Sequence, residues 1–158
     1  MFNRTIIHEL KQWKDSKDRK PLMMLGARQV GKTSVLKKFG EDCFDHCAYF
    51  SLDEEEGVCD IFRKTKNPLQ IIEQLSYLTS EPILPHHTLL ILDEIQDCPE
   101  AISAMKYFCE KTPEYAVACA GSLLGLAFGH QGFSFPVGKV DHMNMYPVTF
   151  SEFLEQRD

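Results

Sequence analysis

The sequence predicts an α/β fold, in which helices cover both faces of a mainly parallel sheet. Apolar segments of strand length alternate with segments of helical periodicity, which is the pattern of such a sheet. One expected strand, Pro21–Leu25, ends at a glycine-containing loop that leads into a helix. Another, Thr88–Leu92, ends in the acid pair Asp93 and Glu94. Both features are typical of the edge of a parallel sheet that holds a phosphate group.

The composition fits a single globular domain. The chain has 158 residues, of which 44% are hydrophobic and 25% are charged, so one sizeable core can form. This composition excludes a disordered tail and a disulfide miniprotein, and no apolar run is long enough to span a bilayer. The first residues lack the apolar stretch of a signal peptide. We therefore expect a cytoplasmic protein without a membrane partner.

Residues 1–20 are expected to form a helix followed by a basic loop. Apolar residues recur at helical spacing between Thr5 and Trp13. Residues 1–40 carry ten lysines or arginines against three acids, whereas residues 41–158 carry seven against twenty. This asymmetry leaves nucleic acid open as a partner, but a solvated helix end and loop explains the charges more simply.

The next elements follow the same alternation. After the strand at Pro21–Leu25, a helix is expected over residues 31–39, with Gly40 placed to stop it. Ala48–Leu52 is the following strand. Downstream, Asn67 is the expected N-cap of a helix that begins at Pro68.

Three further elements are expected in the second half of the chain. Pro99 begins a helix that runs to about Lys111. Tyr115–Ala120 has the composition of a buried strand, and Met143–Tyr146 is expected to be the last strand.

Residues Gly26–Thr33 match the phosphate-loop pattern G-x-x-x-x-G-K-[ST]. The glycines let the backbone curl so that its N–H groups face phosphate oxygens, and the helix that follows adds its positive end. Lys32 would reach the β- and γ-phosphates, and the Thr33 hydroxyl would hold magnesium. A chance match in a chain this long has a probability of roughly half a percent. We expect these residues to bind the nucleotide: Gly26, Ala27, Arg28, Gln29, Val30, Gly31, Lys32, Thr33 and Ser34.

Paired carboxylates at the end of a buried strand need compensation. Asp93 could bind magnesium through its water shell, and Glu94 could act as a general base toward the attacking water. A solvated strand end, or the acidic start of a helix, would explain the pair without a ligand. Downstream of a phosphate loop, the catalytic interpretation is favoured. The adjacent glutamate indicates hydrolysis of ATP by water, and the sequence lacks the guanine-reading motif Asn-Lys-x-Asp.

Two other polar residues lie close to these motifs. Ser122 follows the strand at Tyr115–Ala120 and could hydrogen-bond the γ-phosphate or the attacking water. A Gly-Ser turn without a ligand explains Ser122 equally well. Gln96 follows the acid pair, and we favour a structural role for it over nucleotide contact.

The cysteines do not form a metal-binding pattern. No CxxC pair occurs, and a second ligand pair at metal spacing is missing. We expect reduced and mostly buried thiols at all six positions, which are Cys43, Cys47, Cys59, Cys98, Cys109 and Cys119.

Several stretches together resemble the prokaryotic AAA-type ATPases whose phosphate loop reads G-x-R-Q-x-G-K-T. The Arg-Gln variant of the loop and the late Tyr-Pro…Phe-Ser-Glu-Phe-Leu segment are far more specific than a phosphate loop alone. The resemblance covers nearly the whole chain, in order, through Leu25–Thr33, Leu92–Gln96, Ala120–Leu124, Ser134–Val140 and Tyr146–Leu154.

The resemblance implies a P-loop NTPase three-layer sandwich with a five-stranded sheet, in which the strand of the catalytic glutamate lies inside. It implies the roles given above for Lys32, Thr33, Asp93 and Glu94, and a sensor role for Ser122. Longer members of the family continue into a helical lid and a C-terminal domain of unknown function. Residues 1–158 are therefore expected to be an ATPase core that is truncated before those parts.

The leading hypothesis is a domain that binds ATP and magnesium and hydrolyses ATP. Glu94 would activate water, and Lys32 would stabilise developing charge. No arginine has an evident arginine-finger placement, so a second copy of the chain or a missing C-terminal domain is a candidate partner. Two alternatives stay open: a nucleotide-binding module with negligible hydrolysis, and a nucleic-acid-dependent ATPase. A nucleotide kinase is less favoured because no acceptor-site motif is present.

Overall fold

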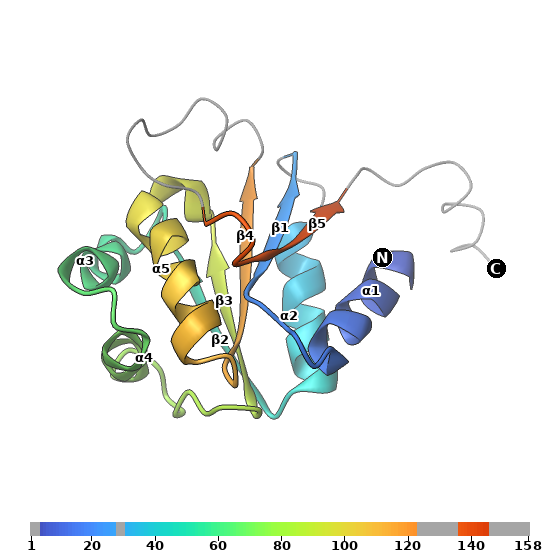
Figure 1. The fold of residues 1–158 in the computed structure, drawn as a ribbon, viewed down its shortest axis with the longest axis horizontal. Coiled ribbons are helices and arrows are strands. Elements are labelled where there is room, and N and C mark those ends of the chain that lie inside the picture. The colour runs from blue at the N-terminus through green and yellow to red at the C-terminus, as the bar shows by residue number, and fades with distance from the viewer. Residues whose placement is uncertain (1–3, 28–30, 123–135, 146–158) are drawn as a thin grey trace.

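Five parallel strands form the central layer of the protein, between two layers of helices (Figure 1). The computed structural model describes residues 4–27, 31–122 and 136–145. The strand order is β2-β3-β4-β1-β5, and every neighbouring pair is parallel. β3, the strand that leads to Glu94, lies inside the sheet between β2 and β4, as the resemblance implied. The strands are β1 (Leu22–Gly26), β2 (His46–Ser51), β3 (Thr88–Asp93), β4 (Ala116–Ser122) and β5 (Asp141–Met145).

Helices cover both faces of the sheet (Figure 1). α1 (Arg4–Asp15) and α2 (Lys32–Cys43) pack on one face. The other face carries α3 (Glu56–Lys64), α4 (Pro68–Ser76) and α5 (Pro99–Lys111), and a short 3-10 helix, η1 (Ile95–Asp97), precedes α5. Among the described residues, no helix is both long and apolar enough to cross a membrane.

The alternation of side chains along β3 decides which residues reach which layer. Leu89 and Ile91 pack in the core beneath α1 and α2, whereas Leu90 and Leu92 pack in the core beneath α3, α4 and α5. Since successive residues of a strand point to opposite faces, Asp93 continues the row that faces α2.

Gly40 does not end the second helix, contrary to the sequence-based expectation. α2 continues to Cys43, and Phe44 follows as its C-cap, with its N–H bonded to the Gly40 carbonyl. A Cβ at position 40 would lie 3.0 Å from Cys47 Sγ and 3.3 Å from Leu89 Cδ2. Glycine is therefore used here because the helix packs closely on β2 and β3.

The Asn67 cap is confirmed, because its Oδ1 accepts hydrogen bonds from the N–H groups of Leu69 and Gln70. The sequence analysis missed α3, which buries Val58, Cys59 and Phe62 against the sheet layer. The expected last strand is present as β5, and Tyr146 lies outside the described residues.

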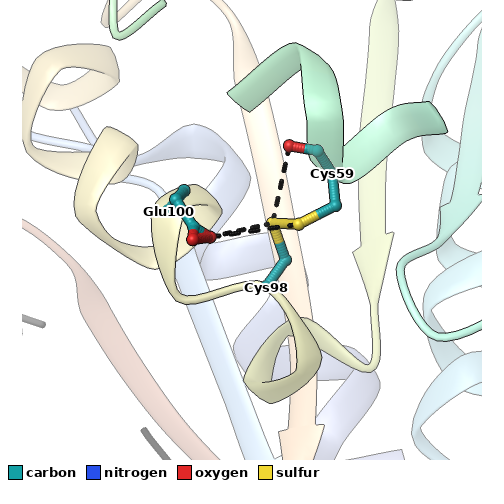
Figure 2. A group of neighbouring side chains, drawn as sticks. All are labelled: Cys59, Cys98 and Glu100. Atoms are coloured by element: carbon teal, nitrogen blue, oxygen red, sulfur yellow. Dashed lines mark hydrogen bonds between the residues drawn. A yellow bond between two sulfur atoms is a disulfide. The ribbon is translucent and has the colours of Figure 1, made fainter. Parts of the chain in front are cut away.

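The expectation of six reduced thiols is wrong for two of them. A disulfide joins Cys59 of α3 to Cys98, the residue just before α5, as Figure 2 shows. The Cα atoms are 5.8 Å apart because α3 packs on α5, although 39 positions separate the residues along the chain. The Glu100 carboxylate lies 3.8 Å from Cys98 Sγ, but the disulfide occupies both sulfurs, so this group does not form a metal site.

Reduction of the disulfide is expected to lower the free energy of unfolding by about 2–4 kcal/mol, because opening this loop returns chain entropy to the unfolded state. Urea unfolding with and without dithiothreitol measures the change, and Cys98→Ser should reproduce it without reductant. Cys109→Ser, which alters a free, half-buried thiol, serves as the control. A thiol titration of the denatured, unreduced chain should find four free thiols; six would contradict the pairing.

Candidate nucleotide-binding site

The predicted site residues meet at one edge of the sheet. β1, β3 and β4 are neighbours and end at the same, upper edge in Figure 1. In the register of β1 and β4, Gly26 stands opposite Ser122. β4 separates the phosphate-loop strand from β3, which ends in Asp93. The fold therefore brings the three predicted motifs to the place where α2 begins.

The phosphate loop leaves β1 at Gly26 and enters α2 at Lys32. Gly31 has φ 92° and ψ 19°, which is left-handed backbone. Glycine adopts this conformation without the steric cost that a Cβ would add, so the second fixed glycine of the motif has a physical reason here. Arg28, Gln29 and Val30 lie outside the described residues.

Lys32 is held inside the loop. Its Nζ donates hydrogen bonds to the carbonyls of Ala27 at 2.8 Å and Gly26 at 3.2 Å, and the residue is only 8% exposed. A buried ammonium is costly unless polar or anionic groups surround it. The loop thus presents a positive charge that suits an anionic ligand such as phosphate.

The first turn of α2 faces the same edge. Helical hydrogen bonding begins with the Val35 N–H, which bonds to the Gly31 carbonyl at 3.0 Å. The amides of Thr33 and Ser34 precede it in the first turn of the helix. These amides and the helix dipole favour an anion at this position.

The Asp93 carboxylate is held by hydrogen bonds to both of its oxygens. The residue is 5% exposed. Its Oδ2 accepts hydrogen bonds of 2.6 Å from both Thr33 Oγ1 and Tyr49 OH, and its Oδ1 accepts one of 2.9 Å from the Glu94 N–H. These donors supply the compensation that a buried carboxylate requires. The two expected magnesium ligands, Thr33 and Asp93, are therefore in direct contact.

Tyr49 belongs to the site, and the sequence analysis missed it. Burial, followed by the hydrogen bond to Asp93 and the charge of that carboxylate, raises the pKa of the Tyr49 phenol well above its ordinary value. The phenol therefore stays protonated and donates. Lys37 Nζ lies 3.9 Å from the centroid of its ring. No sequence motif contains Tyr49. It lies near Asp93 only because β2 pairs with β3 in the folded protein.

Glu94 has an unusual backbone conformation. With φ 53° and ψ 47°, it lies in the left-handed region, which costs a non-glycine residue of order 1–3 kcal/mol and is concentrated at functional sites. The turn directs the chain from β3 into η1. Glu94 is half-buried, and its Oε2 accepts a 2.6 Å hydrogen bond from Gln96 Nε2.

Ser122 ends β4 and is 9% exposed. Its backbone N–H donates to Gln96 Oε1 at 3.2 Å. Because residues of even number along β4, such as Ala118 and Ala120, face α1 and α2, Ser122 lies on the side of the sheet where α2 begins. Gln96 itself is buried, at 4% exposed, which agrees with the structural role expected for it.

Solved structures with this fold include ORC and DnaA proteins. The chain matches a structure described as Drosophila ORC bound to DNA with a TM-score of 0.60 and 13% identity, over 96% of this chain and 44% of that one. It matches AMPPCP-bound DnaA from Aquifex aeolicus with a TM-score of 0.56 and 15% identity, over 98% and 50%. It also matches the Aeropyrum pernix ORC1 protein in complex with DNA with a TM-score of 0.55 and 15% identity, over 98% and 47%.

These similarities concern the fold. The chain spans half or less of the length of each of these structures. Comparison with curated proteins gave no match. A sequence profile described as AAA domain matches residues 18–154, which include the phosphate loop, the acid pair and Ser122. The chain therefore belongs to the AAA domain family.

Proposed function

We propose that this chain binds ATP together with magnesium at the start of α2 and hydrolyses it with a water molecule activated by Glu94. The contact of 2.6 Å between Thr33 Oγ1 and Asp93 Oδ2 carries the proposal. The two residues are 60 positions apart in the sequence and come from different motifs, yet the fold joins the two side chains that the motifs assign to one metal ion. The DnaA structure with the same fold is described as bound to AMPPCP, a nucleotide analogue.

The residues present fit magnesium. A hydroxyl oxygen from Thr33 and a carboxylate from Asp93 are hard oxygen donors, and magnesium is commonly held by one or two such groups together with water and substrate phosphates. When bound, the ion would neutralise part of the phosphate charge. Tyr49 donates to the same Asp93 oxygen as Thr33, so it would help to hold the carboxylate in place.

Side chains and backbone amides of the chain would bind the phosphates and activate the water. The amides of the first turn of α2 and the ammonium of Lys32 would bind the phosphates and oppose the negative charge that develops during transfer. Glu94 would accept a proton from the attacking water at its carboxylate. The Ser122 hydroxyl would hydrogen-bond the γ-phosphate or that water. Phosphate release from ATP by the purified chain, which should require magnesium, tests the proposal.

Asp93→Asn is expected to remove the effect of magnesium on ATP binding. Because the neutral amide is a much weaker metal ligand than a carboxylate, adding magnesium should tighten ATP binding at least about tenfold in the wild type and change it little in this variant. Calorimetric titrations with magnesium and with EDTA measure the difference. Asp97→Asn, which makes the same change at an exposed position of η1, should behave as wild type. Equal enhancement by magnesium in Asp93→Asn and wild type would refute the assignment.

Arg19, a basic residue of the N-terminal segment, is bound within the protein, and nucleic acid is not part of the proposal. The Arg19 guanidinium donates to the carbonyls of Lys14, Pro113 and Glu114 and lies 5.6 Å from the Trp13 ring. It therefore fastens the loop after α1 to the loop before β4.

A domain that binds ATP and hydrolyses it negligibly on its own is the second candidate. Neither Arg19, which is bound to backbone carbonyls, nor Arg63, which pairs with Asp60 at 2.8 Å, points to an arginine finger. We propose that a second copy of the chain, or a further domain of the kind the resemblance implied, completes the site. Turnover that rises faster than linearly with protein concentration would support completion by a second copy.

A further inference from the structure

Gln96 connects the proposed general base to the neighbouring strand. It lies in η1 and bridges two groups: its Nε2 donates to Glu94 Oε2 at 2.6 Å, and its Oε1 accepts the Ser122 N–H at 3.2 Å. We propose that Gln96 is a positioning residue that orients the Glu94 carboxylate against the carboxyl end of β4. The inference rests on the proposed function, because it concerns the base of that reaction.

The direction of both hydrogen bonds is fixed by chemistry. The backbone N–H of Ser122 can only donate, so the oxygen of the Gln96 amide must face it. The nitrogen end must then face Glu94, where it needs an acceptor. The Glu94 Oε2 atom is that acceptor. The bridge would fail if Gln96 were replaced by a residue without an amide.

Gly121 lies so close to this bridge that a larger side chain would crowd it. A Cβ on Gly121 would lie 3.1 Å from Gln96 Oε1 and 3.1 Å from Ile95 Cγ2. Such contacts are tighter than ordinary van der Waals separation, so a side chain at position 121 would force Gln96 and Ile95 to shift by a few tenths of an ångström. Gln96 is also 4% exposed, which removes water as a competing partner for its amide. Close packing and burial therefore keep the amide in one orientation.

The bridge would hold the Glu94 carboxylate in one orientation for proton transfer from water. The Glu94 side chain extends from a left-handed backbone turn, and one carboxylate oxygen is held by Gln96. A proton from water would be taken at the other oxygen, whose direction is set by the first. Catalysis depends strongly on such placement, since a displacement of about 1 Å can cost about 100-fold in rate. Ser122 and Glu94 would also keep a constant separation, because one rigid amide spans them.

The test replaces Gln96 by Met, which has a similar length and neither donates nor accepts strongly. We expect kcat for ATP to fall about 10- to 100-fold and KM to stay within about twofold, because Gln96 is placed to act through Glu94 and not on the nucleotide. Added to Glu94→Gln, the Gln96→Met change should lower kcat no further, as expected for residues that act as a unit. Gln74→Met, the same change at an exposed position of α4, should leave kcat unaltered.

Wild-type kcat in Gln96→Met, or an equal loss in the Glu94→Gln background, would overturn the proposal. A loss that appears only in KM would also overturn it. Gly121→Ala disturbs the same bridge in a second way, because Gln96 stays in the sequence but its side chain must shift. This variant should reproduce the fall in kcat without a change in KM.

An NMR measurement separates failure of this inference from failure of the proposed function. The side-chain amide signal of Gln96 should move on Glu94→Gln and stay in place on Glu73→Gln, an exposed change on α4. If ATP is not hydrolysed and the signal still moves, the proposed function fails and the bridge stands. If ATP is hydrolysed and the signal does not move, the bridge is wrong and the proposed function survives.

Discussion

Lys32→Ala is expected to weaken ATP binding by at least about 100-fold, which corresponds to about 2.7 kcal/mol. The ammonium is the positive charge that the loop carbonyls of Gly26 and Ala27 hold at the proposed phosphate site. Hydrogen bonds between charged partners are among the strongest in proteins, and a buried site has little water to replace them. Alanine keeps the helix propensity of this first residue of α2, so the loss should come from binding.

Isothermal titration with ATP and magnesium measures the effect of Lys32→Ala directly. Lys38→Ala is the matched control, since Lys38 lies on the same helix, is exposed and pairs with Asp42 at 3.3 Å. Removing such a surface pair should cost well under about 1 kcal/mol of stability and leave ATP affinity unchanged. ATP affinity equal to wild type in Lys32→Ala would show that nucleotide does not bind at the loop.

Glu94→Gln is expected to keep ATP binding and lose turnover by about 100- to 10,000-fold, the range typical of a general base. Glutamine has the same size as glutamate but cannot take a proton from water. Its amide oxygen can still accept the hydrogen bond from Gln96. Glutamine should keep the left-handed backbone that Glu94 adopts, so the backbone strain should stay the same.

Two measurements support the interpretation of Glu94→Gln. Calorimetry should give the wild-type affinity for ATP within about threefold, because the general base acts on water and not on the bound phosphates. Glu54→Gln, an exposed change between β2 and α3, should retain full turnover. If Glu94→Gln lost binding together with turnover, the residue would have a structural role in place of the catalytic one.

The sequence predicted the parts of the site that are local in the chain. A phosphate loop is contiguous, and its spacing specifies a strand, a turn and a helix together. Gly31 in left-handed backbone and the start of α2 at Lys32 agree with that prediction. The acid pair was also visible, because two carboxylates directly after a buried apolar strand are unusual. In a parallel sheet both motifs lie at the same edge, and this placement is consistent with the contact between Thr33 and Asp93.

The residues that the sequence did not reveal depend on tertiary packing. Tyr49 approaches Asp93 only because β2 pairs with β3 in a particular register. The Cys59–Cys98 disulfide requires α3 to pack on α5, and no spacing in the chain encodes that contact. Gly40 looked like a helix stop, but its small size serves the approach of α2 to Cys47 and Leu89.

α3 was missed for a different reason. It is nine residues long, and its apolar positions are Val58, Cys59, Ile61 and Phe62. It follows an acidic stretch that is typical of a loop. A helix this short has little intrinsic stability in water, so it depends on the sheet and on α5 for its formation. Local periodicity over nine residues is too weak a signal to predict it.

The most direct test of the account is the rate of phosphate release from ATP and magnesium by the wild type and by Glu94→Gln, measured over a range of protein concentrations. The account predicts a magnesium-dependent rate for the wild type and a rate at least about 100-fold lower for Glu94→Gln at every concentration. Equal rates for the two proteins at every concentration would contradict it, because the water would then be activated by a group other than Glu94.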